Sequence, residues 1–328
     1  ISDFDDPASE MAMLRRVVAR SGRPMAITIL QRDSKPDDWR DLMGHISGAR
    51  AEGLDMVGQV IGRPTGIMLG FEISMNPFTG RPSWDAIASL SLDEKLRHLR
   101  DPSFRAKLLA EVNPRKKLAE RVSRWDRIYP LGDPPNYEPT PDQSVAAIAE
   151  REGRTPEDVA YDLLLQNEGR TILYRPLSNY AYGTLDTVQE MITHPDTLIS
   201  LGDGGAHVGV LSDASATTYL LTHWTRDRDH DRQSLPWAIK RLSRDNALAL
   251  GLRDRGIVEV GKKADLNVID YDALGLRPPE VVYDLPAGGR RLIQRTRGYE
   301  ATVVSGVPVY RDGEATGELP GRLVRGAR

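Results

Sequence analysis

The sequence predicts an α/β fold made of βα units, of the kind that build a TIM-type (β/α)8 barrel, followed by a separate β-rich unit. Two observations support this prediction. Patterns typical of helices and of buried strands alternate on both sides of a loop-rich middle stretch. Beyond Gly251, short β segments are separated by turn signals such as Asp312-Gly313.

The alternation begins in the first part of the chain. Apolar residues at helical spacing predict a helix over Asp5–Gly22, and an apolar, β-branched run predicts a buried strand over Met25–Leu30. A second helix is predicted over Pro36–Glu52, and a second strand over Leu54–Gly62. This order of helix, strand, helix and strand is typical of a parallel sheet covered by helices.

The middle stretch, residues 75–141, is rich in prolines and charged residues. The sequence "NPFTGRPSW" has the turn chemistry of a loop. Ser91 to Glu94 forms a capping-box pattern, and Asp101 followed by Pro102 marks the start of another helix. We interpret this stretch as an insertion between two barrel strands.

After the insertion the alternation resumes. Helices are predicted over Asp142–Glu152 and from Thr155 to about Asn167. The later elements are a strand in "RTILYRP", a helix in "GTLDTVQEMITHP", a strand in "TLISLGD" and a helix over Ser234–Leu250. Only about four barrel-type strands result, whereas eight strands with their helices need ~250 residues. This chain is therefore expected to form only part of a barrel.

Composition excludes several classes of protein. The 328 residues carry a formal net charge of -3, which gives no electrostatic case for a nucleic-acid or membrane partner. The sequence holds no cysteine, so disulfides, thiolate zinc sites and cysteine nucleophiles are excluded. No apolar run approaches the ~20 residues of a membrane span. We expect a cytoplasmic protein.

One motif, "TLISLGDGGAHVGVLSDAS", carries the strongest chemical signal. Asp203 follows an apolar strand, at the position where barrel enzymes place their working residues. A carboxylate there can bind a metal or transfer protons. Gly204 and Gly205 allow a sharp turn and close approach of a ligand. His207 is a candidate to hydrogen-bond substrate or to orient Asp203. The alternatives are an ordinary Asp-Gly-Gly turn and a structural histidine.

The remaining titratable residues of this region give weaker signals. Asp213 is a candidate helix cap, His223 is expected to be structural, and His230 is expected to be solvated. The six histidines form no His-X-His pair and no His-Glu-x-x-His motif. The chain therefore offers at most one convincing metal ligand, Asp203.

Several longer blocks resemble a known family. They are "GDGGAHVG", "RDRGIVEVGKKADLNVIDYDAL", "RPPEVVYDLPAGGRRLIQR" and "GVPVYRDGEATGELPGRLVRG". They are similar to the N-acyl-D-amino-acid deacylase (D-aminoacylase-like) branch of the amidohydrolase superfamily. The resemblance implies the C-terminal part of a distorted TIM-type (β/α)8 barrel over residues 1–253, with the insertion at about 75–141, and a small β-sandwich domain over residues 254–328.

The resemblance also implies an activity. It implies a metal-dependent hydrolase that cleaves the amide C–N bond of N-acyl-(D-)amino acids or related amides. One or two Zn²⁺ ions would activate water, and Asp203 would act as metal ligand and proton shuttle. Asn76, in the loop Met75–Trp84, matches the substrate-facing region loosely. Gln31 stands where many members carry a metal-binding histidine; it is a poor zinc ligand and a good amide partner.

The expected partners are a small-molecule substrate and an N-terminal remainder of the same protein. The family's His-X-His pair is absent, and its remaining metal ligands are expected upstream of Ile1. Three readings stay open: the amide hydrolase, a hydrolase of a cyclic amide, carbamate or lactone, and a catalytically silent binding protein. The oligomeric state also stays open, with a homo-oligomer among the alternatives.

Overall fold

A parallel sheet forms the centre of the barrel-like part. The structure is a computed structural model that describes residues 4, 6–200 and 207–324. The sheet has the order β1-β2-β6, and both pairs are parallel. Its strands are β1 (Met25–Thr28), β2 (Met56–Val60) and β6 (Thr197–Ile199). The two predicted strands in the first part of the chain and the strand before Asp203 are therefore confirmed.

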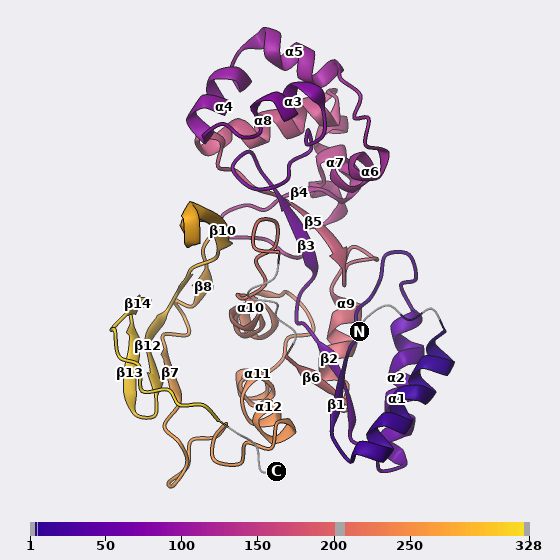
Figure 1. Cartoon of the computed structure of the whole chain (residues 1–328), viewed down its shortest axis with the longest axis vertical. Helices are drawn as coiled ribbons and strands as arrows, with labels where there is room; N and C mark the ends of the chain where they lie inside the picture. The colour runs from indigo at the N-terminus through magenta and orange to yellow at the C-terminus, as the bar shows by residue number, and fades with distance from the viewer. Residues whose placement is uncertain (1–3, 5, 201–206, 325–328) are drawn as a thin grey trace.

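Two helices cover one face of this sheet (Figure 1). They are α1 (Pro7–Ser21) and α2 (Asp38–Ala51), which confirm the two predicted helices. Asp6 accepts a hydrogen bond from the backbone of Ser9 at the start of α1, and Gly22 ends the helix with φ 62°. Gly58 of β2 leaves room for α2, because a Cβ there would lie 2.9 Å from the sulfur of Met43.

A second sheet differs from the prediction. The run "RTILYRP" forms β5 (Leu173–Ser178), which pairs antiparallel with β3 (Thr65–Leu69) and β4 (Tyr129–Pro130). It is therefore not a fourth strand of the parallel sheet. The sequence pattern was ambiguous because an apolar run indicates burial and gives no strand direction. Strand β3 was not predicted, since glycines at positions 66 and 70 interrupt its short apolar run.

A helical body surrounds the far end of this second sheet (Figure 1). Its helices are α3 (Pro82–Ile87), α4 (Leu92–Leu99), α5 (Pro102–Ala110), α6 (Lys116–Val122), α7 (Val145–Glu152) and α8 (Pro156–Gly169), with short 3₁₀ turns at Trp125–Arg127 and Pro141–Gln143. They share a hydrophobic cluster that runs from Ile67 to Leu173. This cluster extends beyond the predicted insertion, because α7 and α8 pack on it as well. The domain boundaries stay predictions.

The helix starts of this body follow the sequence signals. Ser91 accepts from the backbone of Glu94, whose side chain accepts in turn from Ser91, so the capping box is confirmed. Asp101 caps α5, and Thr155 caps α8. Phe71 stacks on Trp84 with ring centroids 5.6 Å apart.

The segment after the helical body returns to the parallel sheet. It contains α9 (Asp186–Thr193), β6, α10 (Ala216–Thr222), a π-helical turn at His223–Asp227, α11 (Leu235–Leu242) and α12 (Arg244–Ala249). The predicted helix over Ser234–Leu250 is thus two helices that meet at Ser243. Figure 1 shows α11 and α12 on the side of the sheet away from α1 and α2.

The C-terminal part is β-rich, as predicted. A four-stranded antiparallel sheet has the order β14-β13-β12-β7, and two further antiparallel pairs flank it. The strands are β7 (Leu266–Ile269), β8 (Gly275–Leu276), β9 (Glu280–Leu285), β10 (Gly289–Ile293), β11 (Thr296–Arg297), β12 (Tyr299–Val304), β13 (Val307–Arg311) and β14 (Glu314–Ala315), with a 3₁₀ turn at Pro286–Gly288. The described sheets do not establish that the parallel strands are part of a (β/α)8 barrel or that the C-terminal strands form a two-layer sandwich, so the partial barrel and the sandwich stay predictions.

None of the helices in the described part of the chain has the length and apolar character needed to cross a membrane.

Candidate functional site

The candidate site lies at the carboxyl edge of the parallel sheet. The backbone of Ile29 donates to Gln59 at 2.9 Å, and the backbone of Ser200 donates to Val60 at 3.1 Å. The chain therefore leaves β6 at the same edge as β1 and β2. Barrel enzymes use this edge for chemistry. The predicted residues Asp203, Gly204 and Gly205 follow β6 in sequence and lie outside the described residues.

The chain is anchored again just beyond these residues. Val208, Gly209 and Val210 accept backbone hydrogen bonds from Leu292, Ser74 and Met68 at 2.7, 3.0 and 2.8 Å. His207 is exposed and has a left-handed backbone, with φ 53°. Its carbonyl accepts from Val210 and Leu211, which closes a turn. The turn that begins at His207 is thus held by backbone contacts to β3, to the loop after β3 and to β10.

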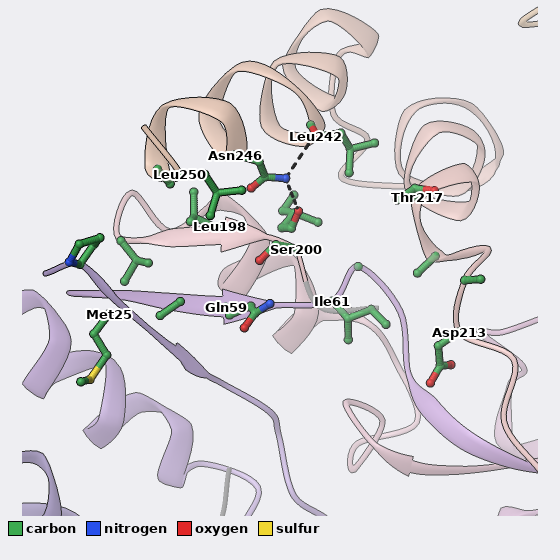
Figure 2. Close-up of a pocket in the computed structure, with 18 of the residues that line it drawn as sticks. Met25, Gln59, Ile61, Leu198, Ser200, Asp213, Thr217, Leu242, Asn246 and Leu250 are labelled. Atoms are coloured by element: carbon green, nitrogen blue, oxygen red, sulfur yellow. Dashed lines mark hydrogen bonds between the residues drawn. The ribbon is translucent and has the colours of Figure 1, made fainter. Parts of the chain in front are cut away.

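A groove of about 560 Å³ runs along the face of the sheet opposite α2. It is lined by alternate residues along β2, by residues of β1 and β6, and by α10 to α12 (Figure 2). Val57, Ile61 and Leu198 make it largely apolar, and Gln59 and Ser200 add polar groups on adjacent strands. An apolar groove with a few polar groups suits a small molecule with both kinds of surface.

Two polar side chains, the half-buried Asn246 and the buried Arg241, hold β6 beside this groove. Asn246 donates to the carbonyl of Ile199 at 3.0 Å, as Figure 2 shows. Arg241 donates to the carbonyl of Thr197 at 2.7 Å. Both ends of this short strand are therefore fixed by α11 and α12.

A buried ion pair closes the carboxyl end of the groove. Nη2 of Arg63, just after β2, donates to Oδ1 of Asp213 at 2.7 Å and to the carbonyl of Ser212 at 2.5 Å. The guanidinium lies 4.1 Å from the ring centroid of Tyr137. Burial by itself would lower the pKa of Arg63, but the contacts with Tyr137 and Asp213 outweigh it and raise the pKa.

This pairing corrects the sequence-based interpretation of Asp213. The residue is not the cap of α10, whose N-cap is Ser215. Its partner Arg63 was missed, because an arginine in the loop "GRPTG" looks like a solvated loop residue. A separation of 150 residues leaves no local pattern that joins the two.

Gln31 and Asn76, the two predicted substrate-binding amides, are engaged within the chain. Gln31 is fully buried; its Nε2 donates to Thr187 at 3.1 Å and its Oε1 accepts from the backbone of Ala181 at 2.9 Å. Asn76 is also buried, and its Oδ1 accepts from the backbone of Phe78 at 2.9 Å. Neither side chain lines the groove. These contacts favour structural roles for both residues.

A second charged cluster was not anticipated. Glu138 faces Nε2 of His223 at 2.6 Å, and Nη2 of Arg228 donates to Glu138 at 3.2 Å. Burial by itself would raise the pKa of Glu138, but the hydrogen bonds from His223, Arg228 and the backbone of Leu185 outweigh it and lower the pKa to about 2. The structural role predicted for His223 agrees with this packing.

The ligand set for a metal is incomplete at the carboxyl edge. Within the described ranges, only Asp186, His230 and Asp231 bring three potential donor atoms within 4.8 Å of one another, and all three residues are exposed. Arg228 donates to Asp186 at 2.5 Å, which competes with a cation. None of the three lines the groove. The described residues at the strand ends therefore do not fit the zinc centre that the resemblance implies.

Comparisons with known proteins point to one family. A sequence profile described as the Amidohydrolase family matches residues 2–310. A search of curated proteins found no match. Two solved structures are similar to this chain: a D-aminoacylase (16% identity, TM-score 0.48) and the N-acyl-D-glutamate deacylase of Bordetella bronchiseptica, complexed with zinc and a phosphonate inhibitor (17%, 0.45). These similarities cover 96% and 93% of this chain, and 52% and 51% of the solved chains.

The chain thus spans about half the length of the solved structures that it matches. The profile match extends from before α1 into β13 and so includes both the parallel sheet and most of the C-terminal strands. This match confirms the amidohydrolase resemblance of the sequence. The chain belongs to the amidohydrolase family.

Proposed function

We propose that the chain carries the proton-transfer segment of an amide hydrolase that acts on N-acyl-(D-)amino acids or related amides. The observation that carries the proposal is the parallel β6, which ends beside β2 and leads directly into the segment with Asp203. Membership of the amidohydrolase family supports a role in hydrolysis for that segment. The D-amino-acid preference rests on the sequence resemblance alone.

In this proposal Asp203 transfers protons during hydrolysis. The carboxylate takes a proton from the attacking water and later gives it to the leaving nitrogen, which is general acid–base catalysis. His207 follows closely in sequence and has an exposed side chain that can bind the substrate. The apolar groove beside β6 accepts the acyl group or the amino-acid side chain.

The zinc ion and its remaining ligands belong to the proposal as well. The resemblance implies one or two ions, which would activate the attacking water. The described residues supply no ligand set for them at the strand ends, so Asp203 and groups outside the described ranges would have to hold them. A cytoplasmic location is proposed on sequence grounds as well.

One observation favours a second candidate, a binding protein without catalytic activity. The ends of β1 and β2 carry Gln31 and Arg63, and both side chains bond to neighbouring parts of the chain. A buried arginine beside these strand ends disfavours a nearby cation. If Asp203 has no metal partner, the groove can still bind an acylated ligand.

The test combines turnover with metal analysis of the purified protein. N-acetyl-D- and N-acetyl-L-amino acids are incubated with the protein, and the released amine is quantified; zinc is measured by atomic spectrometry. Turnover of the D-series with bound zinc supports the proposal. Bound zinc without deacylation, but with hydrolysis of a cyclic amide, carbamate or lactone, supports the alternative hydrolase. Absence of both metal and turnover supports the binding protein.

A further inference from the structure

Among the described residues beside the proposed site, Arg63 is the most deeply buried charged residue. Its side chain is 1% exposed, and its Nη2 makes both bonds to the segment after β6, one to Ser212 and one to Asp213. Its Nε and Nη1 have no hydrogen-bond partner among the described residues. The guanidinium is thus held mainly by Asp213, Ser212 and the ring of Tyr137. Breaking these contacts would leave the guanidinium charge buried without its partners, which costs free energy.

The backbone of Arg63 extends this connection to β1. The carbonyl of Arg63 accepts from Nδ2 of Asn179 at 3.4 Å. Oδ1 of Asn179 accepts from the backbone of Gln31 at 2.8 Å, and the carbonyl of Gln31 accepts from the backbone of Asn179 at 2.8 Å. Buried hydrogen bonds therefore join the ends of β1, β2 and β5 to the segment after β6.

The segment 207–213 receives most of its fixed contacts from elsewhere in the chain. Backbone bonds from Leu292, Ser74 and Met68 hold residues 208–210, and Arg63 holds residues 212 and 213. Arg63 supplies the side-chain hydrogen bonds among these anchors, and it joins the segment directly to the end of β2. The position of His207 depends on both sets of contacts.

We propose that Arg63 is a positioning residue that fixes the segment 207–213, and with it His207, against the carboxyl edge of the sheet. Its effect on turnover rests on the proposed amide hydrolase. Its effect on the segment does not, because that follows from the described contacts alone.

The primary test is hydrogen–deuterium exchange measured by mass spectrometry on the intact chain. In Arg63→Met, the amides of Val210 and Leu211, which close the turn on His207, are expected to exchange at least about tenfold faster than in the wild type. Amides of α2 and α8 are expected to keep their wild-type rates, because neither helix contacts Arg63 by hydrogen bond or ion pair.

A matched control is available on the opposite end of β6. Arg241 is also buried, at 8% exposure, and also donates to backbone carbonyls, those of Ile192 and Thr197. Arg241→Met removes a buried arginine of the same kind without touching the segment 207–213. It is expected to lower the denaturation midpoint and to leave exchange at Val210 and Leu211 unchanged.

Two milder variants keep the test decisive if Arg63→Met does not fold. Arg63→Lys retains the charge on a shorter side chain without the planar guanidinium, and Asp213→Asn retains an acceptor oxygen without its charge. Both are expected to raise exchange at Val210 and Leu211 by a smaller factor. The proposal is overturned if Val210 and Leu211 exchange at wild-type rates in every folded variant of Arg63 and Asp213. An equal rise in α2 and α8 also overturns it, since that is general destabilisation.

Turnover gives the second readout. At a temperature where all variants are folded, kcat is expected to fall about 10- to 100-fold in Arg63→Met, with KM changed less, because small displacements of catalytic groups lower the rate steeply. Arg63→Lys is expected to recover part of kcat. A wild-type kcat in a folded Arg63→Met variant contradicts the proposed effect of Arg63 on turnover. If the wild type turns over no amide, the proposed function fails, and exchange alone decides the positioning role.

Discussion

Glu138 shows how the structure stabilises a buried charge at the level of a single residue. The side chain of Arg228 and the backbone amide of Leu185 donate to its carboxylate, and the ring of His223 faces it. Together they overcome the cost of burial and keep the carboxylate ionised. The cluster joins the loop before α7 to α9 and to the π-helical turn, so one carboxylate connects three segments.

The pKa of Glu138 predicts a specific dependence of stability on pH. Its folded-state value, about 2, lies below the ordinary 4.5, so protonation favours the unfolded chain. The carboxylate therefore contributes stability fully above about pH 4.5, and this contribution is lost as the pH falls toward 2. Glu138→Gln is expected to cost about 3 kcal/mol at pH 7 and progressively less below pH 4.5, in urea titrations at several pH values.

The matched control is Glu120→Gln, an exposed carboxyl on α6. Its free energy of unfolding is expected to stay within about 0.5 kcal/mol of the wild-type value at every pH. A Glu138→Gln cost that stays constant from pH 7 to pH 2.5 would show that the charge of Glu138 does not contribute in this way.

At the scale of single residues, the types of site residue are easier to predict from the sequence than their partners. Asp203 and His207 stand out because chemistry-bearing side chains follow a strand directly. The partners in the pairs Arg63–Asp213 and Glu138–His223 are 150 and 85 residues apart in the sequence, so no local pattern predicts either pair. The place of Gln31 at a strand end predicts a site residue. The structure gives its amide to Thr187 and Ala181, which only the fold brings near.

At the level of elements, the pairing of β3 with β5 depends on a close backbone approach. A Cβ on Gly66 would lie 2.4 Å from the carbonyl oxygen of Arg175 and 2.9 Å from the Cα of Pro176. The register of the pair shifts between Thr65 and Gly66, so the glycine sits at an irregularity of the ladder.

Gly66→Ala is therefore expected to lower the free energy of unfolding by about 1–3 kcal/mol, because backbone atoms have to move. Gly44→Ala is the matched control. Gly44 lies exposed in α2 with no atom within 4 Å of a built Cβ, and alanine favours a helix there by up to about 1 kcal/mol. Urea denaturation compares the two variants. An unchanged midpoint in Gly66→Ala would contradict the register of β3 and β5.

The elements themselves were predicted best where a cap and an apolar stripe coincide. Helices α1, α4, α5 and α8 begin at Asp6, Ser91, Asp101 and Thr155, all of which carry a capping side chain. The direction of β5 and the break at Ser243 could not be predicted in this way. Both depend on tertiary pairing, since an apolar pattern defines a buried face and leaves its partner open.

At the scale of the whole molecule, the described residues form two separate hydrophobic clusters. One surrounds the parallel sheet with α1, α2 and α9 to α11, and the other fills the helical body. The sequence predicted the loops and charges of the inserted stretch. It assigned α7 and α8 to the barrel, because Val145, Ala149 and Leu164 show the same helical spacing that barrel helices show. Their partners became visible only in the folded chain.

The two clusters predict two regions of local stability. Leu164→Ala removes a fully buried side chain from the helical body and is expected to cost that body about 2–5 kcal/mol. Hydrogen exchange is expected to accelerate in α4 and α8 and to stay unchanged in α2. Leu220→Ala, in α10 of the other cluster, is expected to give the reverse pattern. Equal acceleration throughout both clusters would mean that the molecule unfolds as one cooperative unit.

The measurement that tests the central claim most directly is the turnover of Asp203→Asn. The substitution keeps the size and shape of the side chain and removes its ability to accept a proton. If Asp203 transfers protons during amide hydrolysis, kcat for the best N-acyl-amino acid falls by at least about 100-fold, while the urea midpoint stays at the wild-type value. Wild-type kcat in a folded Asp203→Asn variant would contradict the account.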